Sequence, residues 1–353
     1  MKQFFNEQLA GGKIGEGGKR IEWLDTLRVF ACFLVVLTHS AMSGDESDGV
    51  YLAMVSFIGS PSSELFLTVS GAILLPVKTD FRSFYRKRFG KLYPPVIFWS
   101  LICILVYVGI GRESIQEGLA SLLSLPFYPV VGVYWFLYVM IGLYLFAPFI
   151  SFWLRQSSKR QVEFFLFLWL INMALPYANI LIPGFFDSTD GNHYWELNQF
   201  AGFLGYWLLG YYLRKYPVKI GFNLRWIAII TGFVSYVLVL AYLRYSGSEV
   251  ALYFGNLQIG SACFVALIFV VVQSFPIKSV LVNRVIRQIA LCSFGVYLIH
   301  ILIVREVIWL FFEQVEMNPA FEAFSIAVIS LIVCCAIVKI LSFSRITKKL
   351  VGM

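Results

Sequence analysis

An apolar stretch near the N-terminus, "RIEWLDTLRVFACFLVVLTHS" over residues 20–40, carries residues that could do acid-base chemistry. In a helix, Arg28 and His39 lie within about 20° of one face and about 16 Å apart along the axis. Asp25 is spaced to pair with Arg28 at i, i+3. A neutral histidine is suited to general-base chemistry near physiological pH, which makes His39 a candidate for chemistry on this stripe. The alternative for this helix alone is an interfacial charge anchor and a packing histidine.

Two other segments place polar residues at a similar expected depth. Glu64 lies in "SPSSELFLTVSG", early in an apolar run, and "CSFGVYLIH" places Ser293, Tyr297 and His300 on one helix face at i, i+4 and i+7. Polar groups at bilayer depth are costly unless they pair or face a cavity. With His39 they predict a polar cavity that opens toward the outer face. Taken singly, Glu64 is also explained as a helix cap and His300 as a helix-helix hydrogen bond.

The segment "FRSFYRKRFGKLYPP" concentrates positive charge at the expected inner face. Its basic residues are Arg82, Arg86, Lys87, Arg88 and Lys91. Pro94 and Pro95 follow them and predict the start of the next membrane span there. The cluster suits a phosphate-rich cytoplasmic ligand, because guanidinium and ammonium groups bind phosphate well. The other interpretation is the ordinary excess of positive charge in inner loops.

The elements that must position these residues are membrane helices. The chain has 353 residues, of which 59% are hydrophobic and 14% charged, whereas soluble domains carry about 25% charged residues. A span needs roughly 20 mostly apolar residues, and the sequence predicts an all-α polytopic membrane protein with about ten such helices. They are expected at 24–43, 53–77, 94–110, 130–154, 162–182, 197–213, 225–244, 254–275, 288–311 and 321–343.

The distribution of charge orients the helices. With the N-terminus inside, all of the 28 basic residues except Arg112, Arg244 and Arg305 fall on the inner side. This partition predicts cytoplasmic N- and C-termini in the cell (inner) membrane. We expect a flexible cytoplasmic tail over 1–19, one membrane domain over 20–345 and a basic cytoplasmic tail over 346–353. The net charge of +8 then reflects topology and anionic lipids rather than nucleic-acid binding.

Other features exclude several classes of protein. All six cysteines lie in apolar segments without metal-ligand spacing, so they predict neither disulfides nor a metal site. The sequence has no phosphate-binding loop and no dinucleotide fingerprint, and we expect no bound cofactor. Arg305 and Glu306 are spaced either for an interfacial ion pair or for contact with a ligand.

The chain resembles the acyltransferase 3 family of integral-membrane O-acyltransferases. The first span is similar to the family's opening LDxLR signature, with ten residues between an arginine and a histidine. Further similar segments are "ELFLTVSGAILL", "FYRKRFGKLYPP", "YWFLYVMIGLYLFAPFI" and "CSFGVYLIHILIV". Five short motifs in the expected order make the resemblance specific and extend it over essentially all ten spans.

The resemblance implies transfer of an acyl group, usually acetyl from cytoplasmic acetyl-CoA, to a hydroxyl of a surface or lipid-linked glycan. His39 is then the expected base, and Glu64 orients it or binds the acceptor. A transient acyl-histidine relay stays open. The acceptor side is assigned to Ser293, Tyr297 and His300.

The expected donor site follows from the same resemblance. Asp25 holds Arg28, which faces the donor phosphates with Arg88 and Lys91. The family usually has a second arginine where this chain has Lys91, and lysine keeps the charge but loses the bidentate fork. Besides acyl-CoA and a glycan, we expect only membrane lipids as partners.

A proton-coupled transporter or polysaccharide exporter is the competing class, because buried His and Glu residues also serve as proton relays. The absence of an inverted repeat with matching broken helices in two halves argues against it.

Overall fold

The computed structural model describes residues 20–41, 58, 59, 61–181, 200, 202–218, 259–313, 315 and 317–353. In these residues the chain forms helices and has no β-strand, which confirms the predicted all-α class. Its contacts divide it into two compact units. The first comprises Met1–Val29, Glu64–Leu75 and Gln156–Ala290, and the second Phe30–Ser63, Pro76–Arg155 and Leu291–Met353.

Five helical segments of the described part are long and apolar enough to cross a membrane. They are Glu22–Ser40, Phe81–Gly109, Gly132–Gln156, Val280–Phe312 and Pro319–Leu341, and Ser62–Leu74 and Ile259–Ser274 are shorter apolar helices. Several of them expose large apolar side chains, such as Leu105, Phe146 and Ile332, that lipid would cover. The chain is therefore a multi-pass membrane protein. The number of ten spans stays a prediction, and the expected span 225–244 and the tail 1–19 lie outside the described residues.

Helix α5 (Phe81–Gly109) corrects the predicted start of the third span. It runs through Pro94 and Pro95 and begins thirteen residues before the first of them, at Phe81. Asp80 caps it by accepting a hydrogen bond from the Ser83 N–H at 2.9 Å, and this bond lowers the pKa of the Asp80 carboxyl. Prolines inside a long helix can kink it without ending it, and α5 continues as a helix on both sides of the pair. The basic cluster is therefore part of a helix and not of a loop.

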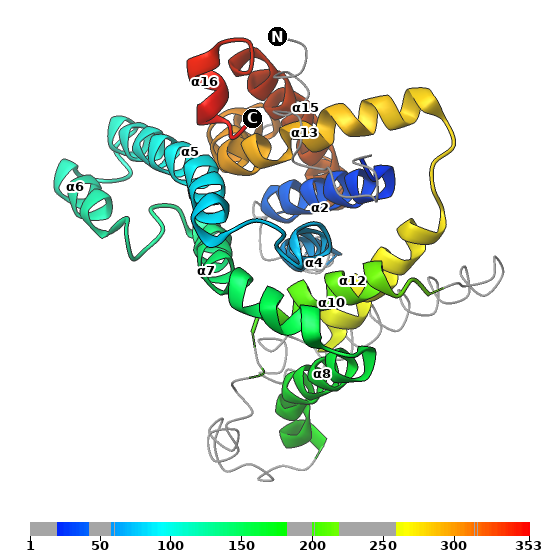
Figure 1. Cartoon of the computed structure of the whole chain (residues 1–353). Helices are drawn as coiled ribbons and strands as arrows, with labels where there is room; N and C mark the ends of the chain where they lie inside the picture. Colours follow the sequence, from blue (N-terminus) through cyan, green and yellow to red (C-terminus); the bar gives the residue numbers. More distant parts are fainter. Residues whose placement is uncertain are drawn as a thin grey trace. The chain divides into compact units, whose positions relative to one another are not determined.

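The first unit is built mainly on the helices α8 (Lys159–Leu181), α10 (Leu204–Lys215) and α12 (Ile259–Ser274). Helix α10 packs against α8 and α12, and the three are neighbours in Figure 1. The same unit holds most of α4 (Ser62–Leu74) and the N-terminal part of α2 (Glu22–Ser40).

Two glycines let α4 and α10 approach within backbone contact. A Cβ atom at Gly71 would lie 2.1 Å from the Trp207 carbonyl oxygen, and one at Gly210 would lie 1.8 Å from the Thr68 carbonyl oxygen. Small residues at such crossings are typical of membrane helices, where close backbone packing replaces the hydrophobic driving force. The pair therefore fixes the position of α4 in this unit.

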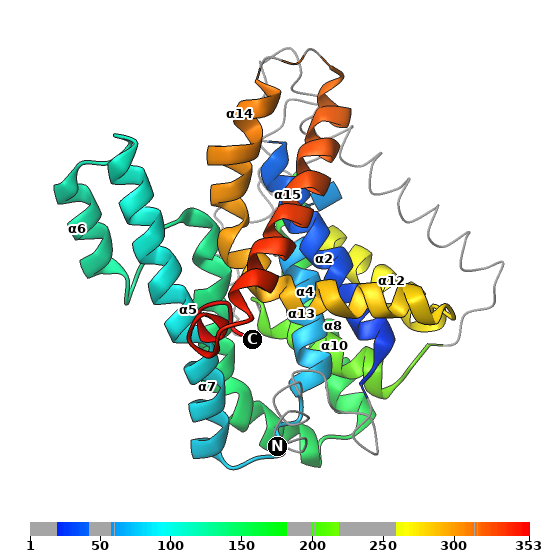
Figure 2. The same ribbon diagram turned by 90° about the horizontal axis from the view of Figure 1, so that it is seen from above.

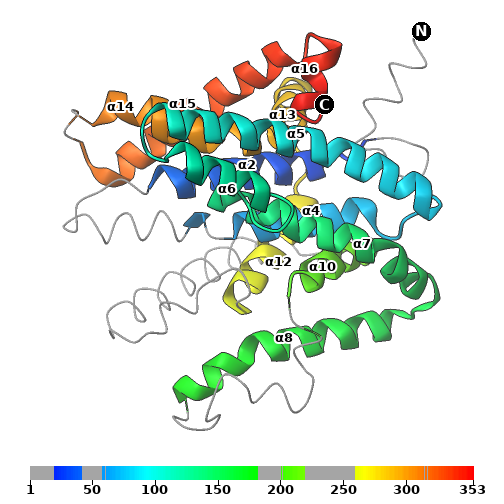
Figure 3. The ribbon, with the colours of Figure 1, turned by 90° about the vertical axis from the view of Figure 1, so that its left-hand side faces the viewer.

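The second unit contains the remaining helices together with the C-terminal parts of α2 and α13. Figure 3 shows α6 (Ile115–Ser124) beside α5, and Ser114 and Glu117 close the start of α6 as a capping box. A 3₁₀ turn, η3 (Gly132–Tyr134), leads into α7 (Trp135–Gln156). Helix α13 (Val280–Ile303) continues as a π-helical turn, η6 (Val304–Ile308), and then as α14 (Trp309–Phe312). Figure 2 shows α14 alongside α15 (Pro319–Leu341).

The C-terminal segment, predicted as a basic tail over 346–353, forms helix α16 (Arg345–Leu350). The Trp99 indole N–H of α5 donates a hydrogen bond to the Leu350 carbonyl oxygen at 2.9 Å. Val351 is fully buried. The carbonyl bond thus ties the segment to α5, while Val351 lies next to Gly295 of α13.

We predict that Gly210→Ala lowers the stability of the protein by about 1–3 kcal/mol, the usual cost of overpacking a tight contact. The matched control is Gly142→Ala on α7, where an added Cβ meets no atom within 4 Å. Removing a helical glycine there should be neutral or stabilising by about 0.5–1 kcal/mol. Thermal unfolding in detergent measures both, and equal melting temperatures for the two variants would contradict the contact.

Candidate active site

Two histidines from distant parts of the sequence meet in the second unit. The rings of His39, near the end of α2, and His300, near the end of α13, have centroids 5.2 Å apart and are tilted by 44°. His300 is fully buried. The sequence predicts a similar membrane depth for both residues, and the structure brings their rings into contact. Two titratable rings in contact inside a helical membrane protein are suited to moving protons.

The hydrogen bonds of His300 determine which of its nitrogens carries the proton. Its Nδ1 lies 2.7 Å from the carbonyl oxygen of Tyr297, one turn earlier in α13. Since a carbonyl oxygen only accepts, Nδ1 is assigned as the donor, and Nε2 of the neutral ring is then an acceptor. Nε2 of His300 and Nδ1 of His39 are both buried without a hydrogen-bond partner among the described residues. Neighbouring rings thus carry two unsatisfied nitrogens.

Tyrosine hydroxyls hold this part of α13 against the turn before α7. The hydroxyl of Tyr297 donates to the Val133 carbonyl oxygen, and the hydroxyl of Tyr134 donates to the Leu298 carbonyl oxygen at 2.6 Å. Ser293, Tyr297 and His300 all lie in α13 as predicted. The Tyr297 hydroxyl is engaged inside the protein, so it positions the helix. The acceptor-side role given to these three residues stays a prediction.

A cavity of about 300 Å³ lies beside His39. Its lining residues are His39, Ser40, Arg112, Val304, Arg305, Trp309 and Ile326, all in the second unit. Arg112 forms an ion pair with Glu306. Arg305 and Glu306 were expected either in an interfacial ion pair or at a ligand, whereas no site role was expected for Arg112. The available signal was that Arg112 and Arg305 are two of only three basic residues expected on the outer side.

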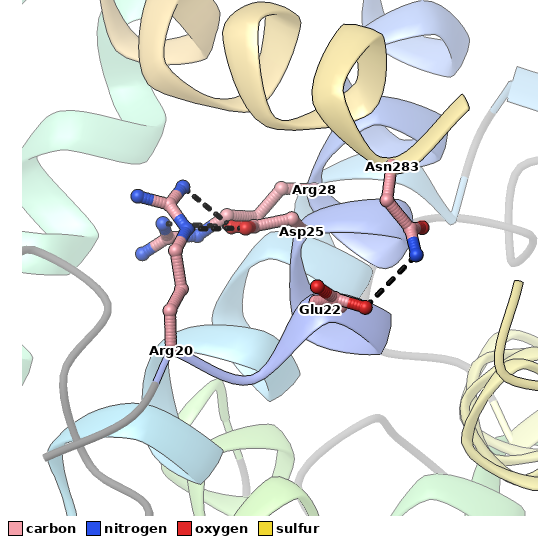
Figure 4. Close-up of polar contacts among 5 residues, drawn as sticks. All are labelled: Arg20, Glu22, Asp25, Arg28 and Asn283. Atoms are coloured by element: carbon pink, nitrogen blue, oxygen red, sulfur yellow. Dashed lines mark hydrogen bonds and ion pairs between the residues drawn. The ribbon is translucent and has the colours of Figure 1, made fainter. Parts of the chain in front are cut away.

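The charged residues at the start of α2 form a local network (Figure 4). Asp25 is buried, and its carboxylate receives both the Nε and the Nη2 of Arg20, the latter at 2.8 Å from Oδ1. Arg28 Nη1 lies 3.8 Å from the same Oδ1, which confirms the predicted pairing of Asp25 with Arg28. Arg20 was missed as the main partner of Asp25, because it precedes the helix and has no helical spacing to it. Asp25 thus contacts two guanidinium groups at the start of α2.

A separate basic site lies on α5 and belongs to the second unit. The guanidinium carbon of Arg88 lies 5.8 Å from the ring centroid of Phe84 and 6.0 Å from that of Tyr144. Its Nε is buried without a hydrogen-bond partner in the described part. Lys91 lies one turn further along α5, and α16, which carries Lys348, packs against α5. A guanidinium between aromatic faces with an unsatisfied donor is ready to receive an anion.

Lys348 is a further member of this basic site that the sequence analysis did not identify. It lies on α16, and the contact of that helix with α5 carries it toward Lys91. The only signal in the sequence was the basic run "RITKK", which was interpreted as a tail.

Glu64 lies in the first unit, fully buried near the start of α4. Its predicted role toward His39, a residue of the second unit, stays a prediction. Within the described residues, no group of three or more His, Cys, Asp or Glu side chains is placed to hold a metal ion.

Comparison with known proteins gives one long match and one short one. The family model described as "Acyltransferase domain" (Acyl_transf_3) matches residues 21–339. A stretch of 101 residues is 26% identical to acyltransferase MdmB of Streptomyces mycarofaciens, covering 28% of this chain and 25% of that protein. The chain thus spans about a quarter of that relative's length. No solved structure matches the chain.

We predict that the neutral form of His300 carries its proton on Nδ1. The chain has three histidines, so ¹⁵N-histidine labelling with His39→Asn and His300→Asn variants assigns each signal. The expected spectrum shows a protonated Nδ1 and an unprotonated Nε2 for His300, because only that tautomer donates to Tyr297 O. A protonated Nε2 would contradict the hydrogen bond.

Proposed function

Because this chain belongs to the acyltransferase 3 family, we propose that it transfers an acyl group from cytoplasmic acyl-CoA to a hydroxyl of a cell-surface or lipid-linked glycan. The acyl group is acetyl, and acyl-CoA is a substrate and not a bound cofactor. The protein lies in the inner membrane with both termini in the cytoplasm. The distribution of basic residues supports this placement.

The observation that carries the proposal is the pair of histidines beside a cavity. A sugar hydroxyl is a poor nucleophile near neutral pH and needs a base within hydrogen-bond reach. His39 lines the cavity, and Nε2 of His300 is an unsatisfied acceptor in the next ring. A hydrogen bond from His39 Nδ1–H to His300 Nε2 satisfies both nitrogens and leaves His39 Nε2 as the base. Such bonds are often long in an empty site and shorten when substrate binds.

The transfer then follows from these roles. His39 Nε2 removes the hydroxyl proton while the sugar oxygen attacks the thioester carbonyl carbon of acyl-CoA. The new carbon-oxygen bond forms and the carbon-sulfur bond breaks, so the ester is the product. The CoA thiolate leaves and takes the proton from His39, which restores the neutral ring. Tyr297 holds His300, and through it the orientation of His39.

The donor requires a site for its phosphates, and the basic site on α5 supports one. Arg88 presents a guanidinium between two aromatic rings, and Lys91 and Lys348 add ammonium groups. Like charges held together are stabilised when an anion neutralises them. Arg28, which pairs with Asp25 in the first unit, keeps its predicted donor-binding role as a separate proposal.

The proposal is tested by acyl-CoA turnover of the purified protein in nanodiscs, with surface glycans of the source cells as acceptor. Thiol release and ester formation should both depend on the glycan. His39→Ala should reduce the rate by about 10²- to 10⁴-fold, the usual effect of losing a general base. Its melting temperature should match that of the wild type. Glycan-independent or absent thiol release would overturn the proposal, and a transporter would give that result.

For the donor site we predict that Arg88→Ala and Lys348→Ala each raise the KM for acyl-CoA by about tenfold, the effect of losing roughly 1.4 kcal/mol of phosphate binding. Lys349→Ala is the matched control, because its side chain is exposed on the same short helix. The KM for the glycan should stay unchanged in all three. An unchanged KM for acyl-CoA in Arg88→Ala would mean that the basic cluster only orients the chain in the membrane.

A further inference from the structure

A group of cysteines from three helices meets in the second unit, outside the lining of the cavity beside His39. Cys32 on α2, Cys292 on α13, and Cys334 and Cys335 on α15 are near enough for their thiols to interact with one another. All four are free thiols, and all are buried except Cys335, which is half-buried. Four of the six cysteines of the chain thus come together from segments that are far apart in the sequence.

Two of these thiols form a pair. The thiols of Cys292 and Cys335 are hydrogen-bonded to each other, and the bond joins α13 to α15. Thiols are weak donors and weak acceptors, so this bond adds little stability, but it holds two sulfur atoms next to each other. Cys32 instead directs its thiol at the carbonyl oxygen of Ser293, which is 4.0 Å from its Sγ. The pair is therefore the part of the group in which two sulfur atoms are placed to react.

Helix geometry determines which cysteine of α15 belongs to the pair. Cys334 and Cys335 are neighbours in the sequence, so their side chains point about 100° apart around the helix. Cys334 is fully buried, whereas Cys335 is half-buried and contacts Cys292. One thiol of the pair is therefore open to a small reagent, and the buried thiol of Cys292 lies beside it.

The surroundings of the pair are those of reactive thiols. Lys339 follows Cys335 by one turn, about 6 Å along α15, and its ammonium group interacts with Cys292. Reactive cysteines are typically partly exposed and close to a cation, and those that respond to oxidants often have a second cysteine beside them that completes the reaction. In the proposed orientation this end of α15 faces the cytoplasm, where disulfides are rare and generally transient.

We infer that Cys292 and Cys335 are a site of reversible oxidation, at which hydrogen peroxide converts the two thiols into a disulfide between α13 and α15. The sulfur of half-buried Cys335 attacks one peroxide oxygen, the oxygen-oxygen bond breaks, and a sulfenic acid and one water form. The sulfur of Cys292 then attacks the sulfenic sulfur, the sulfur-oxygen bond breaks, and a second water leaves. The two thiols thus lose two electrons and two protons to one peroxide, and a thiol reductant reverses the change.

This modification site is independent of the proposed acyl transfer, because neither cysteine lines the cavity or belongs to the basic site on α5. The disulfide links the helix that carries His300 to the helix that carries Ile326 of the cavity lining. Its formation is measured without turnover, so the failure of either proposal leaves the other intact.

The test oxidises the full-length protein in nanodiscs with hydrogen peroxide, after complete reduction and removal of the reductant. Free thiols are then blocked with N-ethylmaleimide in denaturant, and the protein is analysed by intact and peptide mass spectrometry. We expect the oxidised protein to take up two fewer maleimides than the reduced protein, which takes up six. The linked peptides should contain Cys292 and Cys335, and a thiol reductant should restore all six reactive thiols.

Cys292→Ala and Cys335→Ala should each abolish the loss of two maleimides. Cys103→Ala is the matched control, because Cys103 is also buried in the second unit but its Sγ lies 3.8 Å from the Tyr134 hydroxyl. This control should form the disulfide to the same extent as the wild type. A different pair of linked cysteines, a disulfide between two copies of the protein, oxidation of single thiols or six blocked thiols after oxidation would overturn the inference. If a variant does not fold, the peptide map of the oxidised wild-type protein decides the question by itself.

Discussion

The hydrogen bonds of Tyr297 are the interaction on which the rest of the candidate site depends. Its hydroxyl donates to the Val133 carbonyl oxygen in the turn before α7, and its own carbonyl oxygen accepts from Nδ1 of His300. One residue thus sets both the position of α13 and the tautomer of the buried histidine. The bond from Tyr134 to the Leu298 carbonyl oxygen closes the same contact from the other side. Where no water is present, each such bond replaces the hydrogen bonds to water that the polar group has lost.

Several cationic side chains of the described residues have a local partner, and the kind of partner differs from one group to the next. Arg20 and Arg28 share the buried carboxylate of Asp25, Arg112 takes Glu306, and Arg88 lies against aromatic rings. Asp25 thus contacts two guanidinium groups, Glu306 contacts one, and Arg88 lies over two aromatic rings. Ionisable groups inside a helical membrane protein are costly, so each of them is held by a partner of this kind.

Helix ends were the least predictable part of the fold, for a physical reason that α5 and α16 share. Pro94 and Pro95 are strong local breakers, yet α5 begins at Phe81, where Asp80 provides a cap. The C-terminal run looked like a solvated tail because it is basic. It is ordered as α16 because Trp99 and the burial of Val351 provide contacts that its own sequence does not show. Local propensity is a weak predictor where tertiary contacts decide the outcome.

The sequence by itself determined the class of the protein, its helical membrane segments and the residues that share a face, since these depend on composition and on the 3.6-residue period. It also provided the family resemblance and the spacing of Asp25 and Arg28. Only the tertiary structure decided that His39 meets His300 and that the Tyr297 hydroxyl bonds inside the protein. It also decided that Arg112 lines the cavity beside His39 and that Lys348 belongs to the basic site on α5. Periodicity defines a face of one helix. Which other helix that face meets, and which carbonyl accepts a given hydroxyl, depend on close contacts between residues far apart in the chain.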